Sequence, residues 1–274
     1  MDLPLNFFLR MVLGHLIGDF ILQPFWLAMA KRQGWKGLVI HVLVVTLATG
    51  AIIYNVTDDW LCWTFTLFWV HLFIDQFRTF VFTDNSHGKG IILLLLDQAA
   101  HILSLMAISK LAVVWDISML KDIFSYNVAL ETSIITILCL VIVAIWVAPI
   151  LEIEFATAVI SFNGQASKTI IPIGFSDRLL GGCERLMSLW LSIASFGIFI
   201  PFAFVPRFFW LQKHNQSNSN LSTYLKIGTS FVTTLLIVVC TPHIKPYALL
   251  FRAVKCYFFQ VEHVGIWDTC LIIV

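Results

Sequence analysis

The sequence is poor in charged residues, which make up only 12% of its 274 positions. Soluble globular domains carry about 25%, so a chain this apolar is not expected to fold in water. Its net charge of +1 gives no reason to expect a nucleic-acid partner. We therefore predict an all-α protein, a polytopic transmembrane helix bundle in contact with membrane lipid.

Several catalytic and binding motifs are also absent. The sequence contains no HExxH, no GxSxG and no nucleotide-binding loop, which disfavours zincin proteases, serine lipases and ATPases. Its six cysteines are scattered and form no CxxC pair, so we interpret them as small apolar side chains rather than disulfides or thiolate ligands. The N-terminus lacks a basic region and a cleavage site, so we expect the first apolar segment to be retained.

Apolar runs of about 20 residues, long enough to cross the hydrocarbon core, recur along the chain. Polar breaks such as KRQGWKG (31–37) and QKHNQSNSN (212–220) separate them. We expect Pro24 to kink or end the first run. The sequence predicts about seven spans, at residues 4–29, 37–55, 60–82, 90–115, 133–152, 182–206 and 223–242.

Two regions fall outside these spans. Residues 153–181 are short of a full span and are interrupted by polar residues, so we expect a re-entrant or interfacial segment there. Residues 243–274 mix Phe, Trp and Tyr with Lys and Arg, which is typical of a segment at the lipid headgroups; a short eighth span is the alternative. We therefore divide the chain into a bundle, residues 1–242, and an interfacial tail, residues 243–274.

The distribution of basic residues predicts the orientation. The first break carries Lys31, Arg32 and Lys36, whereas the second carries Asp58 and Asp59. Because loops rich in Lys and Arg tend to stay in the cytoplasm, we expect the first loop and the C-terminus inside and the N-terminus outside.

Three of the predicted spans contain a His and an Asp four residues apart. Such residues lie on one face of a helix, and ionisable groups inside a bilayer almost always face the interior of the bundle. Three such faces turned inward would bring three imidazoles and three carboxylates together. The pairs are His15 and Asp19, His71 and Asp75, and Asp97 and His101.

This set of side chains suits a divalent ion such as Zn²⁺, Mn²⁺ or Fe²⁺, and six ligands are enough for two ions. Glu184, at the start of the sixth span, is a candidate general base, as is an Asp that is not bound to metal. His41 stands alone in the second span, so we expect a packed histidine. Four further polar residues can orient the ligands or bind an anionic head group: Gln23, Gln98, Arg78 and Arg185.

Three functions remain open for such a cluster. The first is a membrane-embedded, metal-dependent hydrolase acting on a lipid, a lipid-linked phosphoester or a membrane peptide. The second is a non-enzymatic subunit or scaffold of a larger membrane complex, in which the polar pairs fix helix packing and the 24 Phe and 10 Trp contact other subunits, pigments or a tetrapyrrole. The third is an ion or proton transporter.

Five motifs occur along the chain in the order HLIGDFILQ (15–23), HLFID (71–75), DQAAH (97–101), GGCERL (181–186) and YLKIGT (224–229). Their residues and order resemble a bacterial integral-membrane family, the domain-of-unknown-function 3307 family. The resemblance covers roughly residues 5–240; within it, Lys226 stands where an apolar residue is expected and Asp177 where a glycine is expected. It implies a protein of the bacterial inner (cytoplasmic) membrane and brings no established activity, so the metal hypothesis depends on spacing and burial.

Overall fold

The computed structural model describes residues 3–54, 56–81, 90–115, 126–162, 175–194, 196–214 and 220–240. These residues are helical apart from short turns, and no strand occurs among them, so the all-α prediction is confirmed. The predicted interfacial tail, residues 243–274, lies outside the described residues.

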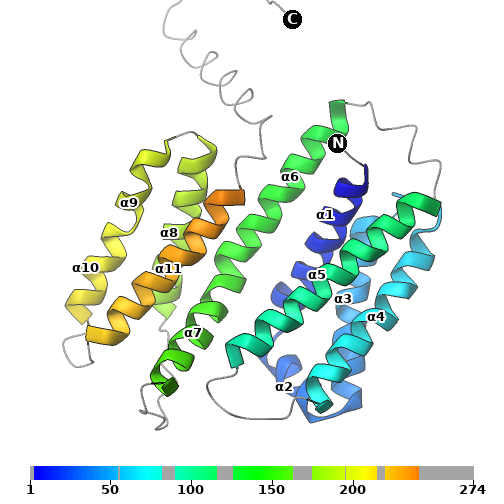
Figure 1. The fold of residues 1–274 in the computed structure, drawn as a ribbon, viewed down its shortest axis with the longest axis horizontal. Helices are drawn as coiled ribbons and strands as arrows, with labels where there is room; N and C mark the ends of the chain where they lie inside the picture. Colours follow the sequence, from blue (N-terminus) through cyan, green and yellow to red (C-terminus); the bar gives the residue numbers. More distant parts are fainter. Residues whose placement is uncertain are drawn as a thin grey trace, which may run out of the picture.

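Five helices of the N-terminal region pack into one bundle (Figure 1). In it, α1 packs against α3 and α5, α2 packs against α3, and α4 packs against both α3 and α5. Its elements are α1 (Leu3–Leu16), the π-helical turn η1 (Ile17–Ile21), α2 (Phe25–Gln33), α3 (Trp35–Ile53), α4 (Trp60–Val81) and α5 (Gly90–Trp115).

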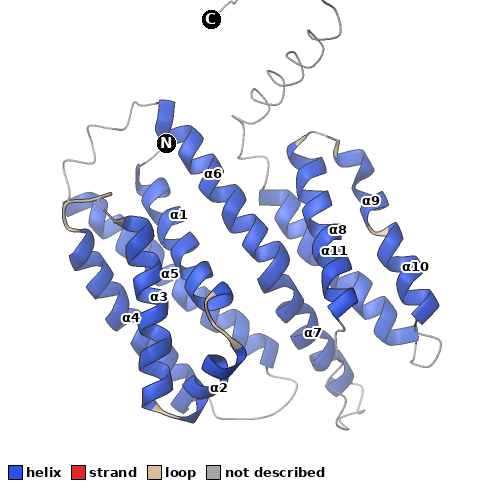
Figure 2. Ribbon diagram, turned by 180° about the vertical axis from the view of Figure 1, so that it is seen from behind, coloured by secondary structure: helices blue, strands red, loops and turns tan. Residues whose placement is uncertain are grey.

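A long helix separates this bundle from the C-terminal helices. It consists of α6 (Tyr126–Ile142), the π-helical turn η3 (Val143–Val147) and α7 (Ala148–Phe162), which follow one another without a break (Figures 1 and 2). It contacts α1 on one side and α8 and α11 on the other. The remaining elements are α8 (Phe175–Ile193), η4 (Gly197–Phe199), α9 (Ile200–Ala203), α10 (Val205–His214) and α11 (Asn220–Cys240).

The long helix corrects the expectation for residues 153–181. The first part of that region does not leave the helix but continues it to Phe162. The polar stretch that suggested a re-entrant segment begins only after this point, and residues 163–174 lie outside the described residues.

Fewer helices than predicted are long and apolar enough to cross a membrane. Among the described residues there are three, Trp35–Ile53, Gly90–Ala112 and Thr132–Val159, or up to four if the bent pair Leu5–Ile21 and Phe25–Gln33 forms one span. The structure therefore supports a membrane protein, but it does not support seven spans.

The other predicted spans fail for physical reasons. The first is broken before Pro24, as expected, and its two helices meet at 92°. The segment at 60–82 is one helix, α4, but its polar residues, including His71, Asp75 and Arg78, lower its apolar character. The segment at 182–206 is divided among α8, η4, α9 and α10, and the apolar part of α11 is too short.

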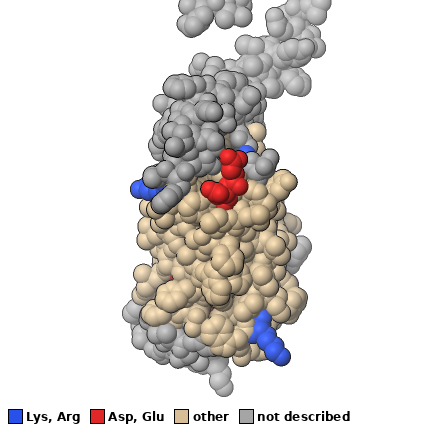
Figure 3. Space-filling model, turned by 90° about the vertical axis from the view of Figure 1, so that its right-hand side faces the viewer, with Lys and Arg blue, Asp and Glu red and all other residues tan. Residues whose placement is uncertain are grey.

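The surface of the helices fits a lipid environment. Large apolar side chains are exposed on the outer faces, among them Leu47, Phe65 and Phe73, each more than 60% exposed. Contiguous apolar surface of this extent is rare on soluble monomers. Figure 3 shows one face with a largely uncharged middle band and charged side chains near its ends. The polar side chains of the spans are instead gathered inside.

Candidate metal centre

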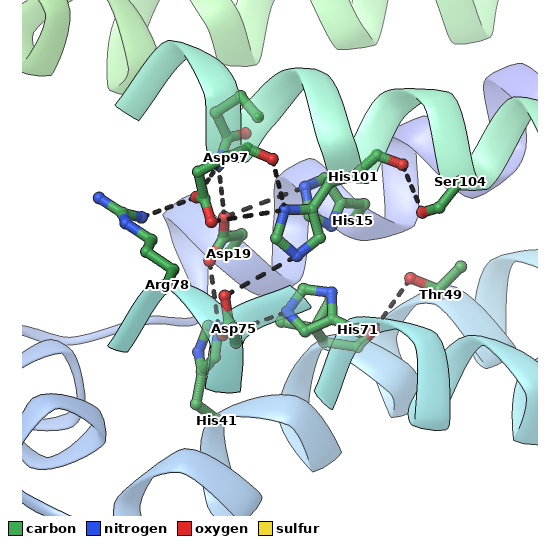
Figure 4. A network of polar contacts seen from close by, with 12 residues as sticks. His15, Asp19, His41, Thr49, His71, Asp75, Arg78, Asp97, His101 and Ser104 are labelled. Atoms are coloured by element: carbon green, nitrogen blue, oxygen red, sulfur yellow. Dashed lines mark hydrogen bonds and ion pairs between the residues drawn. The ribbon is translucent and has the colours of Figure 1, made fainter. Parts of the chain in front are cut away.

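The three predicted His/Asp pairs converge inside the N-terminal bundle (Figure 4). One pair comes from α1 and η1, one from α4 and one from α5, and every member is at most 7% exposed. The i and i+4 spacing therefore does what the sequence suggested: it turns each pair toward the same interior region. These six residues, together with His41 and Lys31, are called the His/Asp cluster below.

A close approach of α3 brings His41 into this cluster. Gly14 and Gly18 face α3; a Cβ at Gly18 would lie 2.5 Å from the Cα of Val45, and one at Gly14 would overlap the backbone of Thr49. Small residues permit such close helix contacts in membranes. As a result α3 can place the His41 side chain against the carboxylates of η1 and α4.

His41 is not merely a packed histidine, which corrects the expectation from the sequence. Its Nε2 lies 3.3 Å from Asp19 Oδ1 and 3.1 Å from Asp75 Oδ2. The ring is fully buried. The one sequence signal for this role was a histidine inside an apolar run, and no partner four residues away supported it.

Lys31 also enters the cluster, although in the sequence it counted only as a loop charge. Its Nζ lies 3.8 Å from Asp19 Oδ1, 3.7 Å from Asp75 Oδ2 and 3.4 Å from His41 Nε2. The bend between η1 and α2 turns this lysine back toward the bundle, so that its side chain is only 12% exposed.

Three of the four predicted orienting residues bind the aspartates of the cluster, two of them at the carboxylates. Gln98 Nε2 donates to Asp19 Oδ2 at 3.3 Å and to Asp97 Oδ2 at 3.2 Å. Arg78 Nη1 donates to the same Asp97 oxygen at 2.7 Å. Gln23, with its amide turned to satisfy its neighbours, donates to the backbone carbonyl of Asp19 at 2.7 Å. The fourth residue, Arg185, lies elsewhere.

The hydrogen bonds of two histidines fix their tautomers. Nδ1 of His101 lies 2.9 Å from the backbone carbonyl of Asp97; since a carbonyl only accepts, Nδ1 is the donor and Nε2 of the neutral ring carries the lone pair. His41 Nδ1 donates in the same way to Gln23 Oε1 at 3.2 Å. Both Nε2 lone pairs then face carboxylate oxygens, an arrangement that requires a proton or another cation between them. Metal-binding histidines are oriented by the same type of hydrogen bond.

Several polar atoms of the cluster make no hydrogen bond, although each is buried. Such atoms are uncommon in proteins and costly, and a bound ion would satisfy them. The atoms are both ring nitrogens of His15, both of His71, Nε2 of His101, Oδ2 of Asp75 and Oδ1 of Asp97.

Two sets of three side chains have ligand atoms within 4.8 Å of one another: His41, His71 and Asp75, and Asp75, Asp97 and His101. Two ligands of a tetrahedral zinc ion lie about 3.4 Å apart when each bond is about 2.1 Å, so both sets suit a divalent ion. His15 and Asp19 belong to neither set. The ring of His15 nevertheless lies 5.0 Å from that of His101.

Glu184 and Arg185 lie in a second buried cluster, between α7, α8, α10 and α11. Arg185 donates from Nη1 to Glu152 Oε1 and from Nε to the carbonyl of Ala144 at 2.6 Å. Arg207 Nη2 donates to Glu152 Oε2 at 3.2 Å, and its Nη1 lies 3.7 Å from Glu184 Oε2. We name Glu152, Glu184, Arg185, Arg207 and Ser230 the Glu/Arg cluster.

The contacts of Glu184 keep it within the Glu/Arg cluster. Ser230 Oγ donates to Glu184 Oε1 at 2.6 Å, and Arg207 faces its other oxygen. No contact among the described residues joins Glu184 to the His/Asp cluster. The structure therefore does not bring the predicted general base to the predicted ligands.

The fold and the His/Asp cluster define a helical membrane protein with a buried candidate metal centre. Residues 7–130 match the family described as "Protein of unknown function (DUF3307)", the family that the sequence motifs resemble. The match includes the whole His/Asp cluster but ends before the motifs at 181–186 and 224–229, so it is shorter than the expected 5–240. No curated protein and no solved structure matches the chain.

Proposed function

We propose that this integral membrane protein binds a divalent metal ion in the His/Asp cluster and uses it to hydrolyse a lipid-linked or other membrane substrate. The observation that carries the proposal is the convergence of buried imidazole lone pairs and carboxylate oxygens, several without a hydrogen bond. Borderline ions such as Zn²⁺, Mn²⁺ and Fe²⁺ suit this mixed set of donors.

The charges of the cluster also favour a bound cation. Among the described residues, the three carboxylates of Asp19, Asp75 and Asp97 face two fixed cations, Lys31 and Arg78. With the histidines neutral, the cluster carries one net negative charge, which is costly in a buried site. A divalent ion changes this to one positive charge, and an anionic substrate group such as a phosphoester would then balance the site.

The residues of the chain can take distinct roles in hydrolysis. A bound divalent ion polarises a water molecule and a substrate oxygen. Asp19 lies outside both ligand sets and is held by Gln98, so we assign it, rather than Glu184, the role of general base. Arg78 is 28% exposed and can bind an anionic group from outside the cluster while it contacts Asp97.

The place of action completes the proposal. We place the protein in the inner membrane of a bacterium, as the family resemblance implies, where lipid and other membrane subunits are its partners. Transport of protons or cations is a second candidate. It is favoured by the series of contacts from Arg78 through Asp97, His101 and Asp75 to His41, each between 2.7 and 3.9 Å long.

Metal analysis of the purified chain tests the proposal. After dialysis against Zn²⁺, Mn²⁺ or Fe²⁺, the protein in detergent is expected to retain metal in a simple ratio to the chain, measured by mass spectrometry of the elements. His71→Ala and His101→Ala are expected to lose it, whereas His263→Ala, in the tail, keeps it. The metal-loaded chain should release inorganic phosphate from vesicles that contain a lipid phosphate monoester.

Each result that contradicts the proposal favours a different function or substrate. A folded protein without bound metal would overturn the proposal and favour a scaffold in which the polar pairs only fix helix packing. A metal-free protein that moves protons across vesicle membranes would favour the transporter. Bound metal without phosphate release from the vesicles would remove phosphate monoesters as the substrate class.

A further inference from the structure

The two ligand sets of the His/Asp cluster differ in their relation to Lys31. Its Nζ lies 3.4 Å from His41 Nε2 and 3.7 Å from Asp75 Oδ2, which are ligand atoms of the first set. On the basis of the proposed function, we infer that the cluster binds one metal ion rather than two, because the ammonium of Lys31 takes the place of an ion at His41 and His71.

Electrostatic repulsion excludes a metal ion beside this ammonium. An ion bonded to His41 Nε2 and Asp75 Oδ2 would lie within a few ångströms of Lys31 Nζ, inside a region where the charges are poorly screened. The lysine already provides the positive charge that the His41 lone pair and the carboxylates of Asp19 and Asp75 require. The first set therefore already has a cation beside two of its members, His41 and Asp75. Its third member, His71, makes no hydrogen bond.

At Asp97 and His101, which the first set does not contain, the cation in contact is Arg78, and it binds Oδ2 of Asp97. His101 Nε2 and Asp97 Oδ1 are buried and make no hydrogen bond. Arg78 and Gln98 both bind Oδ2 of Asp97, which leaves Oδ1 for a ligand. Three protein ligands with a fourth position open to water are typical of a catalytic zinc site. We place the single ion at Asp75, Asp97 and His101.

The position of Lys31 is built into the packing of α2. Gly37 of α3 has no side chain where a Cβ would overlap the backbone of Ala30 and Lys31, so α3 holds this part of α2 closely. Gln23 Oε1 also accepts a hydrogen bond from Lys31 Nζ at 3.3 Å. Because the lysine is held from two sides, it forms a permanent part of the site. Beside one metal ion it provides a second positive charge for the oxygens of a phosphoester.

Zinc stoichiometry of the full-length chain in detergent tests this inference. We expect one Zn²⁺ per wild-type chain and two per chain in Lys31→Met, which removes the charge at similar size. Lys31→Arg keeps the charge and should bind one. Lys36→Met is the matched control, because Lys36 is exposed on the neighbouring helix; it should also bind one.

The results separate this inference from the proposed function. Two ions in the wild type would overturn the inference and leave the function standing, whereas none would overturn the function itself. A folded Lys31→Met chain that still binds one ion would also overturn the inference. If Lys31→Met does not fold, the electron paramagnetic resonance spectrum of the Mn²⁺-loaded wild type decides: isolated Mn²⁺ supports the inference, and an exchange-coupled pair contradicts it.

Discussion

The His/Asp cluster and the Glu/Arg cluster are both buried and both rich in charge, yet their atoms are satisfied to different degrees. In the Glu/Arg cluster, Arg185 contacts Glu152 and a backbone carbonyl, and Arg207 contacts Glu152 and Glu184. The two arginines and the two glutamates balance in charge. In the His/Asp cluster, ring nitrogens and carboxylate oxygens lack hydrogen bonds and the charges of the described residues do not balance.

This difference in pairing distinguishes buried polar groups that hold helices together from buried polar groups that form a ligand-binding site. A buried network whose charges are paired fixes the relative positions of the helices, and removing one member is costly. A buried network with unpaired atoms is stable only if something else pairs them. The match to a protein family covers only the incompletely paired cluster.

The largest expected effect comes from removing a charge of the Glu/Arg cluster. Glu152→Gln removes one of the two carboxylates of the Glu/Arg cluster and leaves an uncompensated positive charge on its buried arginines, so we expect the free energy of unfolding to fall by about 3–5 kcal/mol. Thermal unfolding in detergent measures this loss, and the zinc content of the folded fraction should not change. Glu154→Gln, two residues away and only partly buried, is the control and should unfold as the wild type does.

One result for Glu152→Gln would contradict the structural role that we assign to the Glu/Arg cluster. If Glu152→Gln unfolded like the wild type but lost zinc, the Glu/Arg cluster would belong to the functional site and the pairing of its charges would not indicate a structural role.

The composition of the His/Asp cluster could be predicted from the sequence only in part. His15 and Asp19 and the two further pairs were recognisable because each pair repeats the helical spacing within its own segment. His41 and Lys31 have no such partner; they reach the cluster only through the close approach of α3 and the bend before α2. Glu152 is likewise paired across helices, and it lies 33 positions from Arg185 along the chain.

The number of membrane spans could likewise be predicted from the sequence only in part. The predicted segments at 37–55, 90–115 and 133–152 agree with the three apolar helices, because uniform hydropathy over about 20 residues is a local property. In α4 and α8, charged residues interrupt the apolar sequence, and α8 is followed by the short elements η4 and α9. Whether such helices face lipid depends on packing, which hydropathy does not report.

An intermediate effect is expected where the His/Asp cluster depends on backbone contact. In Gly18→Ala the new methyl group would lie 2.5 Å from Val45 Cα, and a backbone atom cannot yield as a side chain can. The variant should push α3 away and move His41 from Asp19 and Asp75. Because His41 contacts Asp75, a ligand of the proposed ion, we expect weaker zinc binding. We also expect the free energy of unfolding to fall by about 1–3 kcal/mol.

Zinc titration and thermal unfolding check both effects in Gly18→Ala. Gly228→Ala, where nothing lies within 4 Å of the new Cβ, is the control and should bind zinc as the wild type does. Unchanged zinc affinity in a destabilised Gly18→Ala chain would show that the site tolerates movement of α3, and a role of His41 in positioning Asp75 would be refuted.

The smallest expected change in stability comes from alanine substitutions at two adjacent glycines of α8. A Cβ at Gly181 would lie 2.9 Å from Arg207 Nη1 and 3.2 Å from Arg185 Nη1, whereas nothing lies within 4 Å of one at Gly182. Gly181→Ala should lower the free energy of unfolding by about 1 kcal/mol, because the arginine ends must shift within a network that has no spare partner. Gly182→Ala should raise it by about 0.5–1 kcal/mol, as alanine favours a helix interior. Thermal unfolding measures whether the two variants change the free energy of unfolding in opposite directions. If both variants are equally stabilised, the ends of the arginine side chains can move freely. The Glu/Arg cluster would then not be a rigid network that holds the helices together.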